Sequence, residues 1–162
     1  MSQNPFLKLS GNPEWENLKP KHIRGDITQA LEQAENNLQK IRDLKPDETT
    51  FANTVKALEH ASDDLYYAWG LITHLDSVCN SPELRDAHNE MLPAVSAFGA
   101  KITLDPQLWD TLQAFSKGEE ADSLSSIDKR LLKETLLDFQ EAGADLAEDQ
   151  RLRLEQISQE LA

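Results

Sequence analysis

Apolar side chains recur at steps of three and four residues along most of this chain, and this spacing restricts the fold more than any other feature. An α-helix turns once every 3.6 residues, so the spacing places apolar positions on one face that a core can cover. The clearest run comprises Ile23, Ile27, Ala30, Leu31, Ala34, Leu38 and Ile41. We expect a helix from Lys21, with Pro20 in its first turn.

The same spacing predicts further helices along the chain. A second should run from Thr49 or Thr50 to about Asp76, with one apolar stripe formed by Phe51, Val55, Leu58, Leu65, Trp69 and Ile72. A capping residue followed by proline predicts two more helix starts, at Ser81-Pro82 and at Asp105-Pro106. Pro93 should kink or split the helix that begins at Pro82.

Two further helices are predicted towards the end of the chain. After an acidic loop at residues 119–126, a fifth helix should begin near Ser126 and end before Gly143. Its apolar stripe is Ile127, Leu131, Leu132, Leu136 and Phe139. A final helical segment is expected from about Glu148.

These patterns define the fold class. Residues 1–20 are interrupted by proline, asparagine and glycine, which predicts an extended arm laid over a core. No stretch alternates with a period of two between hairpin turns, so no strand is expected. The prediction is an all-α protein with about six mostly antiparallel helices in a bundle, divided into an arm (1–20) and a helical domain (21–162).

Composition excludes several classes of partner. The 162 residues include 16 Lys and Arg against 29 Asp and Glu, a formal net charge of -13. This charge disfavours nucleic acid and anionic membranes. One cysteine, Cys79, forms no internal disulfide, and neither a secretory signal nor an apolar run of membrane-spanning length is evident. We expect a soluble, cytoplasmic protein.

The histidines do not form a recognisable metal motif. His22, His60, His74 and His88 include no pair four residues apart, and HExxH is absent. We expect His60 to be solvated or locally paired. No glycine-rich phosphate loop occurs, so nucleotide binding is disfavoured.

Two other clusters have a functional and a structural interpretation. His74, Asp76 and Cys79 resemble a base and a nucleophile, but they fall within six residues and lack an oxyanion-donating turn. We expect Cys79 to pack as a small apolar group. Around Tyr66, Tyr67 and Trp69, a core Trp69 with one surface tyrosine is favoured over a peptide-binding aromatic shelf. No catalytic, cofactor-binding or metal-ligating residue is therefore assigned.

Several segments together suggest a family. The stretch LKPKHIRGDITQAL (18–31), the stretch HLDSVCNSPELR (74–85) with Leu92-Pro93 beyond it, LDFQEAGADL (137–146) and the segment 151–161 occur in this order. They resemble the N-terminal helical region of oligopeptidase A-like zinc metallopeptidases of the thimet oligopeptidase family. Cys79 departs from the family pattern, which commonly has lysine there.

The resemblance implies a longer parent protein, in which zinc binds at a downstream HExxH helix and short peptides are hydrolysed in a channel between two lobes. This chain would form one wall of that channel and pack against the C-terminal catalytic region. It would be inactive alone. The excess of acids would suit basic peptides, but a generally solubilising surface explains it better.

Other interpretations remain open. The last expected helix lacks a cap and has acids near its C-terminal end, which favours truncation over a natural terminus. Exposed surface on such a fragment would favour a dimer. The alternative is a free-standing acidic helical interaction module, and a small metal or thiol enzyme is a third possibility.

Overall fold

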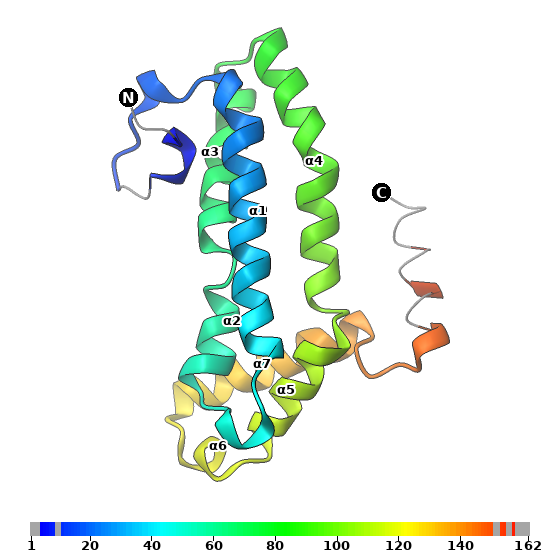
Figure 1. Ribbon diagram of the computed structural model, residues 1–162. Helices are drawn as coiled ribbons and strands as arrows, with labels where there is room; N and C mark the ends of the chain where they lie inside the picture. Colours follow the sequence, from blue (N-terminus) through cyan, green and yellow to red (C-terminus); the bar gives the residue numbers. More distant parts are fainter. Residues whose placement is uncertain (1–3, 9–10, 151–152, 155–156, 158–162) are drawn as a thin grey trace. The chain divides into compact units, whose positions relative to one another are not determined.

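The regular elements of the protein are helical. The computed structural model describes residues 4–8, 11–150, 153, 154 and 157, and no strand occurs among them. The all-α prediction is confirmed (Figure 1). The α-helices of this part of the chain are α1 (Pro20–Arg42), α2 (Ala57–Glu59), α3 (Asp63–Val78), α4 (Pro82–Ile102), α5 (Pro106–Ser116), α6 (Glu119–Ser123) and α7 (Ser126–Ala142).

The chain forms two compact units, each assembled from two separate stretches of sequence. Unit 1 contains the described residues up to Leu38 together with Glu59–Phe98. Unit 2 contains Gln39–Leu58 and the described residues from Gly99 onward. Across the described residues, no helix combines the length and apolar character needed to span a lipid bilayer.

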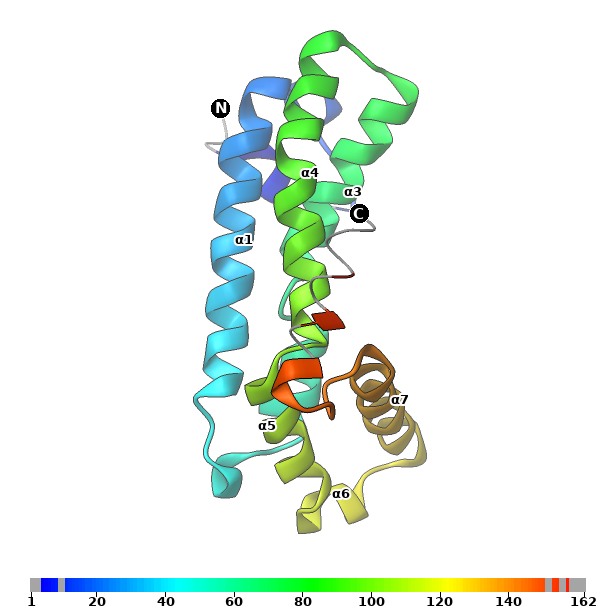
Figure 2. The ribbon, with the colours of Figure 1, turned by 90° about the vertical axis from the view of Figure 1, so that its right-hand side faces the viewer.

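Unit 1 is built from three helices that run alongside one another (Figures 1 and 2). Helix α1 begins at Pro20 as predicted, and its apolar stripe faces a shared core. Buried core residues from all three helices are Ile23, Ile27 and Ala30 of α1, Leu65, Ala68 and Ile72 of α3, and Leu84, Met91 and Val95 of α4.

Helix α4 begins where the cap-and-proline pattern predicts. Ser81 Oγ accepts the backbone N–H of Leu84 at 3.2 Å. Pro93 does not split the helix, which continues to Ile102. Met91 and Val95 on either side of the proline are buried in the core, so side-chain packing holds the helix together where one backbone hydrogen bond is missing.

The N-terminal arm packs against the helices of unit 1 through Phe6. Two short 3-10 turns that the sequence did not predict, η1 (Pro5–Leu7) and η2 (Trp15–Asn17), interrupt the extended arm. The Phe6 ring is fully buried, and its backbone N–H donates to Asp26 Oδ2 at 2.8 Å. A buried carboxylate is therefore the polar anchor of the arm.

The prediction of one continuous helix from Thr49 or Thr50 to Asp76 is wrong. A π-helical stretch, η4 (Ala52–Lys56), and α2 precede a turn at residues 60–62, after which α3 begins. The Ala61 carbonyl accepts the side-chain amide of Asn37 at 3.1 Å. This bond satisfies a carbonyl at the turn, and the acids Asp63 and Asp64 favour a new helix N-terminus.

In unit 2, helix α5 packs against α7 and against η4. Two ring pairs join these elements, Phe51 with Phe115 and Trp109 with Phe139, each with centroids 6.2 Å apart. A 3-10 turn, η3 (Pro46–Glu48), follows α1.

Two predictions for unit 2 need correction. The acidic segment expected to be a loop contains helix α6, since Gly118 precedes acids whose negative charge suits a helix N-terminus. Ile127, placed on the apolar stripe of α7, is 78% exposed, whereas Leu132 and Phe139 are buried. Ile127 lies in the first turn, where the helix has not yet reached the core.

Helix α7 ends at Gly143, as predicted. Gly143 has a φ of 97°, in the left-handed region that favours glycine. A short helical stretch begins at Glu148, where a final helix was expected, but most of that segment lies outside the described residues.

We expect Gly143→Ala to lower the free energy of unfolding by about 1–3 kcal/mol. An added Cβ would be strained at this φ and would lie 2.9 Å from methyl groups of Leu146 and Leu154. The measurement is urea unfolding followed by circular dichroism. Gly25→Ala in α1 is the control, because nothing lies within 4 Å of its added Cβ; equal effects of the two substitutions would contradict the prediction.

Asp26 should make the stability of unit 1 depend on pH. Burial raises the pKa of Asp26, and the Phe6 N–H bond and the charge of His22 oppose this shift. Because the folded state binds the proton more tightly, the stabilising contribution is fully present below the ordinary pKa of 3.8. It is lost as pH rises through the raised pKa.

Unfolding measured against pH for the natural protein and for Asp26→Asn checks this dependence. The natural protein should gain stability relative to Asp26→Asn as pH falls. Asp26→Ala should cost about 1–3 kcal/mol, because it leaves the buried Phe6 N–H without its acceptor. Parallel pH profiles for the natural protein and Asp26→Asn would refute the prediction.

Candidate functional site

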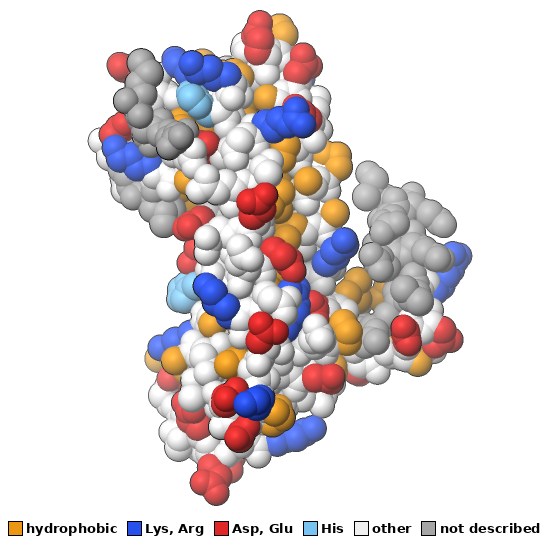
Figure 3. Space-filling view, viewed as in Figure 1, with side chains coloured by type: hydrophobic (Ala, Val, Ile, Leu, Met, Phe, Trp, Pro, Cys, Tyr) orange, Lys and Arg blue, Asp and Glu red, His pale blue; other side chains and the backbone are white. Residues whose placement is uncertain are grey.

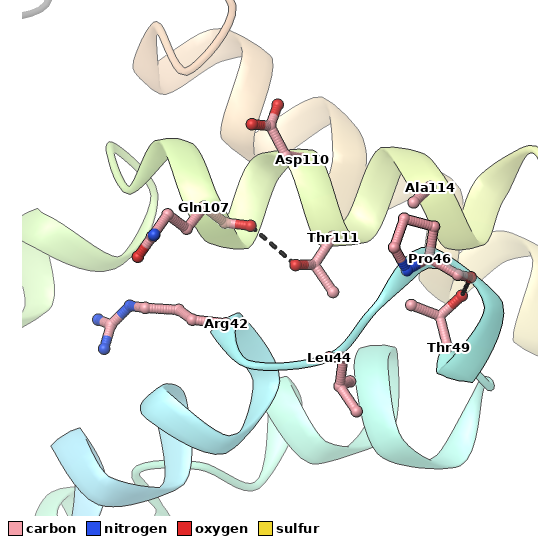
Figure 4. A pocket seen from close by; sticks show the side chains of 8 residues that line it. All are labelled: Arg42, Leu44, Pro46, Thr49, Gln107, Asp110, Thr111 and Ala114. Carbon is pink, nitrogen blue, oxygen red and sulfur yellow. Dashed lines mark hydrogen bonds between the residues drawn. The ribbon is translucent and has the colours of Figure 1, made fainter.

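A pocket of about 220 Å³ lies within unit 2, between the segment that follows α1 and helix α5 (Figure 4). Both apolar and polar groups line it. The lining residues are Arg42, Leu44, Pro46, Thr49, Gln107, Asp110, Thr111 and Ala114.

An ion pair beside this pocket connects α1 to the start of α5. Arg42 Nε donates to Asp105 Oδ2 at 2.7 Å, and the two side chains are only 11% and 16% exposed. Asp105 Oδ1 caps α5 by accepting the N–H groups of Gln107 and Leu108 at 2.9 and 3.1 Å. One carboxylate thus caps the helix and binds the guanidinium.

The hydroxyl groups in the pocket are engaged with nearby backbone carbonyls. Thr111 Oγ1 donates to the Gln107 carbonyl and Thr49 Oγ1 to the Pro46 carbonyl, each at 2.9 Å (Figure 4). The lining contains neither histidine nor cysteine. This part of the described chain therefore offers hydrogen-bond acceptors for a small polar group, and it does not pair a nucleophile with a base.

The structure gives the candidate imidazole and carboxylate different partners and leaves the candidate thiol exposed. Cys79 is exposed, so the prediction that it packs as an apolar group is wrong. Cys79 follows the end of α3, at the turn into α4. Its neighbour Val78 is exposed too, with an exposed fraction of 66%. The His74 ring lies 5.8 Å from Trp15, and Asp76 pairs with Arg85 at 3.6 Å. His74 and Asp76 therefore contact different neighbours.

The other histidines have structural contacts. His60 Nδ1 lies 2.8 Å from Asp63 Oδ2, which confirms the expected local pairing. His88 stacks on Trp69 with ring centroids 4.7 Å apart. Trp69 is half-buried against the core of unit 1, and Tyr66 is 47% exposed, as expected for a surface ring.

The described residues do not supply a set of zinc ligands. Within that part of the chain, no group of three or more histidine, cysteine, aspartate or glutamate side chains is arranged to hold a metal ion. A zinc centre built from these side chains therefore has no location among the described residues.

Comparison with known proteins defines the class to which the chain belongs. Residues 20–151 match the N-terminal domain of neurolysin and thimet oligopeptidase. The match covers most of the sequence and all of the helices from α1 to α7. The chain belongs to the neurolysin/thimet oligopeptidase family, in which it corresponds to the N-terminal domain.

Individual relatives are similar over almost the whole chain. Oligopeptidase A of Haemophilus influenzae is 30% identical over 154 residues, which are 95% of this chain and 22% of that protein. A probable cytosolic oligopeptidase A of Arabidopsis thaliana is 29% identical over 99% of this chain and 23% of its own length. Oligopeptidase A of Escherichia coli is 26% identical over 98% of this chain and 23% of its own length.

The same comparisons show how much of each relative this chain represents. It spans about a fifth of the length of the relatives that it matches.

Sequence analysis did not identify Arg42 as part of a site. The available signal was a basic side chain in the last turn of a helix, a position that usually serves the helix dipole. The sequence marks Asp105 as a helix cap. Its second partner, Arg42, lies 63 residues earlier, and no pattern near either residue indicates that they pair.

We expect Asp105→Ala to destabilise the protein by about 2–4 kcal/mol, because it removes the cap of α5 and leaves the largely buried Arg42 without its carboxylate. Asp105→Asn should cost less, since its amide oxygen still caps the helix. Thermal unfolding of both variants measures the difference. Asp110→Ala, an exposed acid in the same helix, is the control; a loss as large as that of Asp105→Ala would show that the ion pair is not the cause.

Proposed function

We propose that this chain is the channel-wall domain of a zinc-dependent oligopeptidase that hydrolyses short peptides. The observation that carries the proposal is the family match over residues 20–151, together with relatives named oligopeptidase A that align along almost the entire chain. In this proposal zinc and the catalytic groups belong to a C-terminal catalytic region outside these 162 residues. The described residues lack a zinc ligand set, so we derive no catalytic step from them.

A wall domain of this kind acts by shape and by movement. Helices whose stripes are buried in a core, as in unit 1, are rigid enough to form the side of a channel. Such a wall would admit short peptides and exclude folded proteins, and closure of the two lobes would shield the bound peptide from water. Short peptides and the catalytic region are therefore the proposed partners.

The gene beyond the codon for Ala162 provides the first test. A reading frame that continues to an HExxH motif would support the proposal. A stop codon at that position would overturn it in favour of the free-standing helical interaction module, whose partner would then be sought.

Hydrolysis of a short internally quenched peptide provides the second test. With added zinc, residues 1–162 alone should give no hydrolysis above background, and the full-length protein should cleave the peptide. A variant that lacks residues 1–162 but still excludes folded proteins as the intact protein does would contradict a role in restricting access. Zinc-dependent cleavage by residues 1–162 alone would contradict the assignment of catalysis to the rest of the protein.

A further inference from the structure

The exposed surface of α4 carries no charge between Met91 and Phe98, the part of its second half that belongs to unit 1. Residues 91–100 include no Asp, Glu, Lys or Arg, although 28% of the chain is charged. Five residues of this stretch are nevertheless exposed within unit 1, and we call them the uncharged α4 face: Leu92, Pro93, Ala94, Ser96 and Ala97. Figure 3 shows apolar side chains gathered over α4.

Helix α3 continues this surface within unit 1. The stacked rings of Trp69 and His88 fix how the two antiparallel helices lie beside each other. Tyr66 lies about one helical turn before Trp69 on α3, and Leu92 lies about one turn after His88 on α4. Because the helices are antiparallel, Tyr66 and Leu92 lie at about the same height along the two helix axes. Tyr66 is 47% and Leu92 41% exposed, and residues 65–75 also contain no Asp, Glu, Lys or Arg.

The exposed side of α1 differs in charge. Lys21, Arg24, Glu32 and Glu35 are all exposed on this helix. Covering such a surface with protein would remove several ions from water, which is costly unless each finds a partner. Covering the uncharged α4 face requires no such compensation and removes apolar surface from water.

We propose that the uncharged α4 face is the surface on which the remainder of a full-length oligopeptidase packs. This inference rests on the proposed function. The aligned relatives include α4 in matches that span 95–99% of this chain, yet more than three quarters of each relative lies outside the match. Interfaces between domains of one chain typically bury about 600–1,500 Å² in total, and an uncharged helical face can enter such an interface without leaving an ion unpaired.

The chemistry of the face favours a packed domain over a bound peptide. An extended peptide presents backbone N–H and C=O groups that need hydrogen-bond partners when they are buried. Among the five residues of the face, only Ser96 has a hydrogen-bonding side chain. Side chains of another helix or sheet would fill such a surface without leaving polar groups unsatisfied.

Cysteine labelling tests the proposal in the full-length protein. In a Cys79→Ser background, one variant carries Ser96→Cys on the face and its matched control carries Asn36→Cys, at an exposed position on α1. The reaction with a maleimide should proceed at similar rates at both positions in residues 1–162 alone. In the full-length protein, labelling at position 96 should slow by about tenfold or more, while labelling at position 36 should not change.

A charge placed on the face gives an independent readout. Ala97→Lys and its control on α1, Thr28→Lys, should each leave the melting temperature of residues 1–162 nearly unchanged, since both positions are exposed. In the full-length protein only Ala97→Lys should lower the melting temperature and restore fast labelling at position 96.

The possible results separate the inference from the proposed function. A full-length peptidase that labels equally fast at positions 96 and 36 would overturn the inference and leave the proposed function standing. Protection that depends on protein concentration would replace it with self-association. A change in KM for charged peptides without protection would make the face part of the channel. A reading frame that ends at Ala162 would overturn both.

Discussion

The carboxylate of Asp105 joins two stretches of chain on which unit 2 depends. One oxygen caps α5, and the other binds Arg42 in the last turn of α1, so the start of one helix is fixed to the end of another 63 residues earlier. The ordered segment between α1 and η4 can then lie beside α5, and the pocket of unit 2 forms between them. Because both side chains are largely buried, removing one of them leaves the other without its opposite charge in a partly desolvated place, which is costly.

Local signals in the sequence were sufficient to place several helices. Pro20, Pro82 and Pro106 begin α1, α4 and α5 as predicted, because a fixed φ and a missing N–H suit the first turn of any helix. Gly143 ends α7 for an equally local reason, its left-handed backbone. Apolar spacing added the core-facing stripes, since periodicity determines which side chains share a face.

Features that depend on distant residues were not predictable in this way. The break after α2 involves Asn37, which lies 24 residues before the carbonyl that it binds. The pocket requires Arg42 to meet Asp105, and the exposure of Ile127 depends on where the core of unit 2 ends. Spacing indicates that a helix has an apolar face, but only packing determines how much of that face is covered.

The distribution of charge connects the fold to the proposed role. The chain has a net charge of -13, yet residues 91–100 of α4 include no charged side chain. If solubility alone had shaped the surface, exposed positions in residues 91–98 would carry acids, as exposed positions on α1 and in the first half of α4 do. An uncharged face on a rigid helix instead suits contact with another part of a protein, which is consistent with a family whose members continue far beyond this domain.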